Sequence, residues 1–193
     1  MKNDNAFALL PHISEKLKQR TSPLLVAIDG RCASGKSTLA AHLYEMLPGS
    51  TVFHMDDFFL PPEMRTEDRL SSPGGNVHYE RFLEEVLYNI NKNIPFTYNK
   101  YDCHRDAYTS HTINPSSICI IEGAYSMHPK LFDFYDISVF LSISPSLQKA
   151  RLKQRETPES FKNFIDRWIP LEEKYIAFYE PNKKADFLLE AQS

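Results

Sequence analysis

The stretch that most constrains the fold is the run GRCASGKS, from Gly30 to Ser37. It fits the pattern G-x4-G-K-[ST], in which two glycines let the backbone turn tightly and a lysine and a hydroxyl follow. A continuous apolar run, 24–28, precedes it, and helical apolar spacing follows it over 36–47. The backbone N–H groups of such a loop, together with the helix N-terminus, bind phosphate oxygens. The stretch therefore predicts a strand, a phosphate-binding loop and a helix.

The segments after this loop alternate between strands and helices. We expect strands where apolar residues are continuous, and helices where they recur every three or four residues. The expected strands are 24–28, 51–55, 118–121, 137–143 and 187–189, and the expected helices are 36–47, 79–90, 146–156 and 161–179. This alternation is typical of a parallel sheet covered on both faces, so we predict a three-layer α/β/α sandwich. The length of 193 residues suits a single domain, 1–193.

Charge, cysteine content and apolar runs indicate which partners and which compartment to expect. The formal net charge is −3 with acids and bases interspersed, which favours neither a nucleic acid nor a membrane partner. The cysteines Cys32, Cys103 and Cys119 form no CxxC pair, so we expect reduced thiols and a cytoplasmic location. No apolar run approaches the length that spans a bilayer. The sequence leaves a homo-oligomer open.

Acidic residues follow two of the predicted strands. The stretch HMDDFF contains Asp56 and Asp57, and Glu122 follows the apolar run ICII. Ligands bind at the carboxyl ends of strands in open α/β sheets, so one aspartate could take the proton of an attacking hydroxyl. Glu122 could hold Mg²⁺ or its water beside Ser37, whose hydroxyl is also expected on the metal. An ordinary polar loop or a helix cap is the alternative reading of these acids.

Basic residues gather on the predicted helix after the fourth strand. Arg151 and Arg155 are spaced i, i+4 and share one helix face, and Arg167 lies beyond a break. Guanidinium groups that close over a terminal phosphate stabilise its charge during transfer. A solvated surface helix is the alternative. On the first interpretation, the nucleotide is bound by Gly30, Ala33, Ser34, Gly35, Lys36, Ser37, Thr38, Arg151 and Arg155.

Together, GRCASGKST, HMDDFF, IIEG, ARLKQRE and EPNKKADFLLE resemble the phosphoribulokinase/uridine kinase family over nearly the whole chain. DDFF and RWIPLEEKY also look like nicotinamide riboside kinases. The resemblance implies a P-loop fold like that of the nucleoside monophosphate kinases, with a five-stranded parallel sheet, ATP as donor and a mobile helical lid over about 151–168. It implies Asp56 as catalytic base and as a metal contact, with Phe59 at the position of a substrate-stacking tyrosine. Glu122 matches the metal-associated glutamate of the family.

The acceptor-binding segments, about 57–80 and 98–111, depart from uridine kinases. Val77 stands where the family has a sugar-binding aspartate, and Glu80 could take over that contact or simply favour the helix dipole. In YDCHRDAY, Tyr101 is retained, Cys103 replaces an aromatic residue and the histidine is shifted to His104. We therefore expect Asp56, Phe59, Glu80, Tyr101, His104 and Arg167 to contact the substrate. The identity of the base is not supported.

These features predict an ATP- and Mg²⁺-dependent kinase that phosphorylates a small-molecule hydroxyl. The 5′-hydroxyl of a uridine- or cytidine-like nucleoside or related riboside is the expected acceptor. The alternatives are a kinase of a non-nucleoside metabolite, or a nucleotide-dependent switch protein that hydrolyses ATP slowly. The sequence leaves open ATP against GTP, and whether Asp56 or Asp57 is the base.

Overall fold

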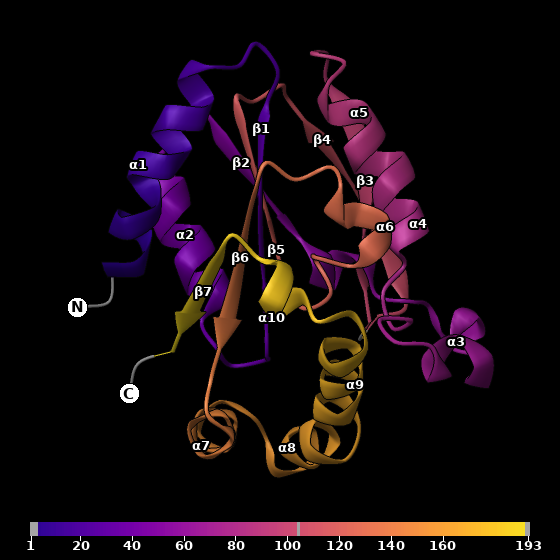
Figure 1. The fold of residues 1–193 in the computed structure, drawn as a ribbon. Coiled ribbons are helices and arrows are strands. Elements are labelled where there is room, and N and C mark those ends of the chain that lie inside the picture. Colours follow the sequence, from indigo (N-terminus) through magenta and orange to yellow (C-terminus); the bar gives the residue numbers. More distant parts are fainter. Residues whose placement is uncertain (1–3, 104, 192–193) are drawn as a thin grey trace.

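A five-stranded parallel sheet forms the centre of the computed structural model, which describes residues 4–103 and 105–191. The strand order is β2-β5-β1-β6-β7. The strands are β1 (Leu24–Gly30), β2 (Ser50–His54), β5 (Ile118–Glu122), β6 (Ile137–Ser142) and β7 (Phe187–Glu190). Figure 1 shows helices on both faces of the sheet, which confirms the predicted three-layer fold.

Each face of the sheet has its own hydrophobic core. On one face, α1 (Asp4–Lys18) and α2 (Lys36–Met46) pack their apolar side chains against those of β1, β5 and β6. On the other face, the segment α4 (Tyr79–Phe82), η3 (Leu83–Leu87) and α5 (Tyr88–Ile90) packs with α6 (Pro129–Phe132). The middle strand β1 is buried along its whole length, as the continuous apolar pattern predicts.

The helices beyond the carboxyl ends of the strands begin at well-defined caps. Ser144 caps α7 (Pro145–Arg155), and Thr157 caps α8 (Pro158–Asn163), each with a proline in the first turn. The π-helical turn η4 (Phe164–Trp168) joins α8 to α9 (Ile169–Tyr179), and α10 (Pro181–Lys184) leads into β7. The expected helix over 161–179 therefore starts earlier and contains a π-turn.

Two parts of the described fold were not predicted from the sequence. The first is α1, whose apolar spacing is interrupted by Pro11. The second is the antiparallel hairpin of β3 (Phe96–Asp102) and β4 (Ala107–Ile113). Every residue of β4 is exposed or half-buried, so this strand lacks the apolar pattern that marks the others.

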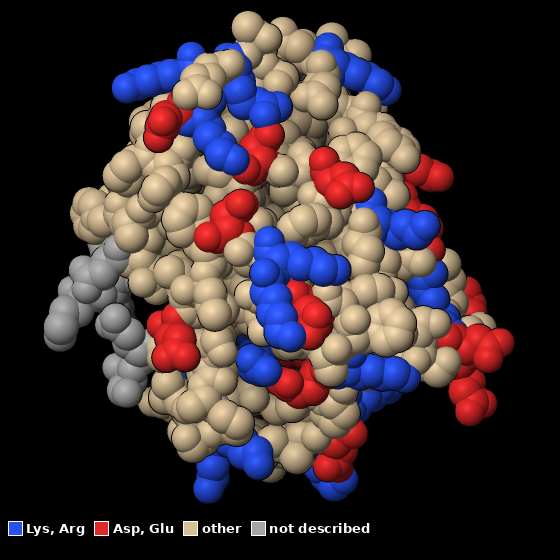
Figure 2. All heavy atoms as spheres, viewed as in Figure 1, with Lys and Arg blue, Asp and Glu red and all other residues tan. Residues whose placement is uncertain are grey.

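The short elements between β2 and α4 are also outside the sheet. They are η1 (Met55–Phe58), η2 (Pro62–Met64) and α3 (Glu67–Ser71). On the face drawn in Figure 2, acidic and basic side chains are interspersed. Among the described helices, none combines the length and the apolar character needed to cross a bilayer.

Gly30, the last residue of β1, is fixed by its neighbour in the sheet. Its φ is +141°, and a Cβ built there would lie 2.1 Å from the Leu141 carbonyl oxygen on β6. Gly35 has a φ of +102°, but a Cβ there would meet no atom within 4 Å. The two glycines of the loop therefore differ: both need a left-handed backbone, and only Gly30 also needs the space.

We expect Gly30→Ala to lower the free energy of unfolding by at least about 3 kcal/mol, since backbone strain and a clash add. The matched variant Gly35→Ala should lose only about 1–2 kcal/mol, since strain acts alone. Urea unfolding of both variants measures the difference. Equal losses would show that contact with β6 is not what requires Gly30.

Candidate active site

The order of the strands brings the candidate residues to one edge of the sheet. The phosphate loop follows β1, Glu122 ends β5, and η1 with its two aspartates follows β2. Because β2, β5 and β1 are consecutive parallel neighbours, their carboxyl ends meet at the same edge. Residues far apart in the chain thus share one place, where open α/β sheets bind their ligands.

A cleft of about 1160 Å³ opens at this edge. Of the residues expected at the site, Ala33, Ser34, Gly35, Lys36, Ser37, Thr38, Asp56, Phe59, Glu122, Arg151 and Arg155 line it. Gly30, Glu80, Tyr101 and Arg167 are not among its lining residues, and His104 lies outside the described residues. The aromatic residues that line the cleft are Phe59, Tyr125, Phe164 and Trp168, of which the last two belong to the π-turn η4.

The phosphate loop turns through left-handed residues into α2. Ala33 has a φ of +61°, and Gly35 directly precedes the first helical residue, Lys36. The Lys36 ammonium is buried and donates to the carbonyl oxygens of Gly30, at 2.8 Å, and Arg31, at 3.0 Å. The lysine side chain therefore folds back over the start of the phosphate loop, at the N-terminus of α2.

Residues of α7 and α9 contact the loop directly. The Cys32 backbone N–H donates to Glu172 Oε2 at 2.8 Å, and Arg31 donates to both carboxylate oxygens of Glu173 at 2.5 and 2.9 Å. From α7, Arg151 Nη1 donates to the Ala33 carbonyl oxygen at 3.0 Å. The sequence pattern did not identify the two glutamates as loop contacts, since nothing in RWIPLEEKY says which side chains face the loop.

Beneath the loop, the buried carboxylate of Asp29 accepts hydrogen bonds from three segments of the chain. It accepts from its neighbour Gly30 N–H at 2.6 Å and from Tyr125 N–H and Met127 N–H at 3.1 and 2.9 Å. It also accepts from the Tyr175 hydroxyl at 2.8 Å, which brings in α9. Asp29 thus joins the end of β1, the turn after β5 and helix α9.

Glu122 connects the loop helix to the end of β2. Its Oε2 accepts from Ser37 Oγ at 3.1 Å, and its Oε1 lies 2.5 Å from His54 Nδ1. This hydrogen bond raises the pKa of His54, since the carboxylate favours the protonated ring. His54 was not assigned a role from the sequence. Its contact follows from the β2–β5 register, which pairs His54 with Glu122.

The oxygen atoms at this point fit a magnesium ion. Ser37 and Glu122 are in contact, and Asp56 lines the same cleft, so only oxygen donors are offered. Within residues 4–103 and 105–191, no three His, Cys, Asp or Glu side chains gather into a metal site. Mg²⁺ commonly takes one or two carboxylates and completes its shell with water and substrate phosphates, which suits this sparse arrangement.

The structure separates the two aspartates of η1. Asp57 forms an ion pair with Lys100 Nζ at 3.2 Å and accepts from the Tyr98 hydroxyl at 3.5 Å. Asp56 instead lines the cleft and is exposed there. Desolvation by the surrounding wall of the cleft raises the pKa of Asp56, an effect that Lys36 opposes. The pair lies in a 3₁₀ turn rather than in a strand, so strand alternation does not decide which one faces the cleft.

On the acceptor side, several candidate residues are engaged with neighbours. Glu80 forms an ion pair with Arg69, with distances of 2.6 and 2.8 Å to its two oxygens. The Tyr101 hydroxyl donates to Asp106 Oδ1 at 2.6 Å within the hairpin. Arg167 is exposed and lies against the Trp168 ring. These contacts hold the acceptor segments in shape, and of the expected substrate residues that the structure describes, Asp56 and Phe59 line the cleft.

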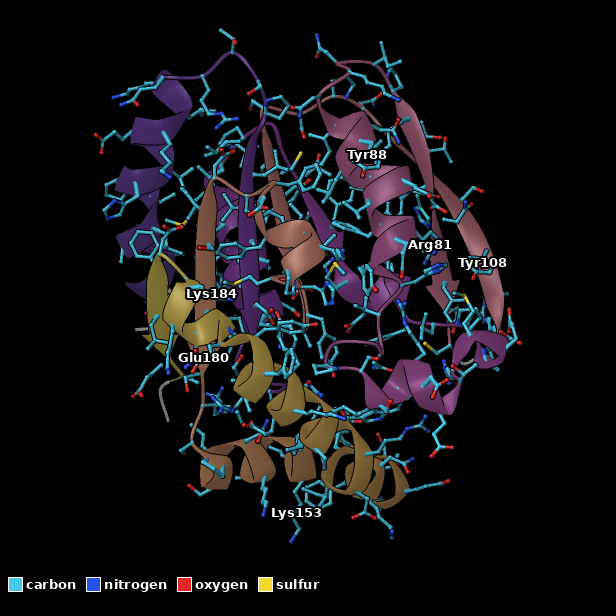
Figure 3. All side chains as sticks on the ribbon, turned by 45° about the vertical axis from the view of Figure 1, so that its right-hand side comes forward. Arg81, Tyr88, Tyr108, Lys153, Glu180 and Lys184 are labelled. Atoms are coloured by element: carbon cyan, nitrogen blue, oxygen red, sulfur yellow. The ribbon has the colours of Figure 1, made fainter. Side chains whose placement is uncertain are left out.

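Arg81 fixes the hairpin against η1. Figure 3 shows its side chain extending from α4 toward Tyr108 on β4. The guanidinium lies 4.3 Å from the Phe58 ring centre, and it donates to the carbonyl oxygens of Asn99 and Asp57. One cation thereby ties together the helix, the hairpin and the turn that carries Asp56.

His128, directly before α6, packs against Tyr79, the first residue of α4. It is buried and stacks on Tyr79, with ring centres 4.1 Å apart, and its Nδ1 accepts from Lys130 N–H. Burial lowers the pKa of His128 to about 4. An imidazole with a depressed pKa is neutral in the folded protein, and protonating it favours unfolding.

We expect this histidine to make stability fall with acid. Its contribution is complete above the ordinary pKa of 6.5 and is lost as pH falls from there toward about 4, by up to about 3 kcal/mol. In His128→Phe, which retains an aromatic ring against Tyr79, this component is removed. Between pH 7.5 and 4, the free energy of unfolding of the wild type should therefore fall by more than that of His128→Phe. A difference independent of pH would contradict the prediction.

The chain is similar to known proteins over most of its length. No protein-family model matches the chain. The chain is 24% identical over 186 residues to a uridine kinase of Ligilactobacillus salivarius, covering 89% of this chain and 86% of the relative. It is 27% identical over 176 residues to a uridine kinase of Ureaplasma urealyticum, covering 84% and 85%.

Solved structures share its fold. A structure described as a possible uridine kinase from Bacillus stearothermophilus has a TM-score of 0.68 at 24% identity, over 94% of this chain and 99% of that one. Phosphoribulokinase from Rhodobacter spheroides has a TM-score of 0.58 at 14% identity, over 88% and 70%.

These similarities support the resemblance to the phosphoribulokinase/uridine kinase family. The likeness to solved structures confirms the predicted P-loop kinase fold, and the relatives named uridine kinases support the expected transfer of a phosphoryl group to an alcohol.

Proposed function

We propose that this kinase transfers the γ-phosphoryl group of ATP to the hydroxyl of a small molecule, with Asp56 as the base. The observation that carries the proposal is the shared cleft: the phosphate loop, Ser37, Glu122 and Asp56 line it together. Asp57, by contrast, is neutralised by Lys100. The 5′-hydroxyl of a nucleoside or related riboside is the proposed acceptor, because the curated relatives are named uridine kinases.

The proposed reaction begins when Asp56 accepts the proton of the acceptor hydroxyl. The acceptor oxygen forms a bond to the γ-phosphorus, while the bond from that phosphorus to the β,γ-bridging oxygen breaks and its electron pair stays on ADP. A carboxylate with a raised pKa is a stronger base than an ordinary aspartate, which suits this proton transfer. The protonated Asp56 then returns its proton to solvent.

The remaining residues bind and orient. Backbone N–H groups of residues 33–38 and the N-terminus of α2 bind the phosphates, and Lys36 lies close enough to turn from its carbonyl partners to a phosphate oxygen. Ser37 and Glu122 would hold Mg²⁺, which supplies charge neutralisation of the phosphate oxygens when bound. His54 keeps Glu122 oriented toward Ser37. Arg151 and Arg155 of the proposed lid lie at the cleft wall on α7, where they would stabilise the transferred group.

The experiment that tests this function is ATP turnover with and without candidate acceptors. Mg-ATP is supplied with a panel of nucleosides, ribosides and sugar phosphates, and products are identified by mass. We expect at least one hydroxylic acceptor to stimulate turnover many-fold over the acceptor-free rate. Slow ATP hydrolysis that is indifferent to every acceptor would instead favour a nucleotide-dependent switch.

The choice of base is tested by a matched pair of variants. We expect Asp56→Asn to reduce transfer by about 10²- to 10⁴-fold with ATP affinity nearly unchanged, because the amide cannot accept the proton. Asp57→Asn should retain most of the transfer rate and lose some stability through Lys100. Initial rates and nucleotide titrations separate the two effects. If Asp57→Asn lost transfer and Asp56→Asn did not, the assignment would be reversed.

The loop lysine gives an independent check on the nucleotide site. In Lys36→Ala, the ammonium that faces the loop is removed, so we expect ATP affinity and transfer to fall together, by at least about 10-fold. Isothermal titration with ATP and a rate measurement follow both quantities. Unchanged nucleotide binding in a folded variant would count against the loop as the phosphate site.

A further inference from the structure

The charged side chains that line the cleft are almost all matched by partners. The acids Glu122 and Glu172 accept hydrogen bonds from Ser37 and from the Cys32 N–H, and Glu156 pairs with Arg155 at 2.7 Å. The cations that line the cleft are Lys36, Arg65, Arg151 and Arg155. Lys36 and Arg151 donate to loop carbonyl oxygens. Arg65 and Asp56 are the charged residues that line the acceptor side of the cleft, and there Arg65 donates to a backbone carbonyl oxygen through Nε.

Arg65 follows η2, on the acceptor side of the cleft. Its Nε donates to the Leu60 carbonyl oxygen at 2.8 Å, which leaves the two terminal nitrogens of the guanidinium available. In the part of the chain that the structure describes, no carboxylate lies within ion-pair distance of it. Arg69, four residues later, is by contrast neutralised by Glu80. In Figure 1, α3, which follows this segment, lies away from α7, with α8 and α9 between them.

Asn76 lies beside Arg65 and also lines the cleft. Both side chains belong to residues that contact the Leu60 backbone: Arg65 donates to its carbonyl oxygen, and the Leu60 N–H donates to the Asn76 carbonyl oxygen at 3.4 Å. Asn76 is 8% exposed, and its side-chain amide makes no hydrogen bond to another described residue. A buried residue with amide donors and a guanidinium without a carboxylate partner thus line the same cleft, and both contact the Leu60 backbone.

These groups lie close to the proposed base. Leu60 follows Asp56 by four residues, and a 3₁₀ turn plus a short extended segment spans on the order of 10 Å. Cys103, which also lines the cleft, lies within electrostatic range of both Arg65 and Asp56. A single small acceptor can thus place its hydroxyl at Asp56 and another group at Arg65.

We propose that the acceptor carries an anionic group, a carboxylate or a phosphate, and that Arg65 and Asn76 bind it. The inference rests on the proposed alcohol kinase function and specifies its substrate class. A guanidinium without a counter-charge becomes costly once the proposed lid closes over the half-exposed Arg65, and an anion on the acceptor removes that cost. Arginine presents paired N–H donors that match the oxygens of carboxylates and phosphates, and the Asn76 amide adds another donor.

The inference sets apart anionic acceptors from the neutral nucleosides. A riboside that bears a carboxylate, or a sugar phosphate with a free hydroxyl, satisfies both ends of the cleft. Uridine or ribose alone satisfies only the end at Asp56. Phe59, on the same wall, provides an apolar contact for the ring between the two ends.

The test uses acceptors in pairs that differ in the anionic group. With Mg-ATP, orotidine is compared with uridine, D-glycerate with glycerol, and ribose 5-phosphate with ribose, scored by product mass and initial rate. We expect the wild-type protein to favour an anionic member by at least about 10-fold in kcat/KM, the range of a charge-assisted hydrogen bond. The carboxylate and phosphate pairs show which anion is used.

Variants assign that preference to Arg65. We expect Arg65→Gln to lose about 10- to 100-fold in kcat/KM for the anionic acceptor, mainly through KM, and less than about two-fold for its neutral partner. Arg65→Lys keeps the charge and should recover part of the loss. The control Arg20→Gln removes an arginine that pairs with Asp136 before the start of β1, at the end of the sheet opposite the cleft, and should behave like the wild type.

The outcomes separate this inference from the function on which it rests. Transfer to neutral acceptors as readily as to anionic ones, or an equal effect of Arg65→Gln on both, overturns the anion site and leaves the kinase in place. If Arg65→Gln does not fold, the acceptor preference of the wild type and of Arg65→Lys decides. Transfer to none of the acceptors overturns the proposed function, and the anion site with it.

Discussion

The carboxylate of Asp29 is the interaction on which the architecture of the site depends. Buried at the end of β1, it accepts hydrogen bonds from the first residue of the phosphate loop, from the turn after β5 and from a tyrosine of α9. These partners come from parts of the chain that are far apart in sequence. A buried carboxylate is tolerable only when such donors surround it, so the loop, the turn and the helix are held in one arrangement.

Around this point the cleft has two walls of different construction. The donor side consists of a loop whose carbonyl and N–H groups are contacted by Lys36, Arg151 and Glu172. The acceptor side consists of η1, the hairpin and α4, joined by Arg81. Asp56 sits between them. On the proposed function, the tightly hydrogen-bonded loop binds the nucleotide and the opposite wall selects the acceptor.

The sequence predicted the parts of the site that are encoded locally. GRCASGKS specifies its own strand, loop and helix, and the continuous apolar strands predict the parallel sheet that brings Glu122 to the loop. Contacts between distant segments were not predictable in the same way. The pairing of His54 with Glu122 requires the strand order, and the pairing of Glu80 with Arg69 requires the fold of the segment before α4. The hairpin was missed because its outer strand lacks an apolar face.

The π-turn η4 has a consequence for how chains of this kind can diverge. A π-turn contains one residue more than an α-helical turn, and one residue rotates everything that follows by about 100°. Here η4 precedes α9, whose Glu172 and Glu173 face the phosphate loop. Loss of a single residue in this turn would direct other side chains at the loop without any substitution in α9. Segment length, as well as residue identity, therefore determines which partners the loop receives, and alignments of related kinases should be read for insertions and deletions at this position.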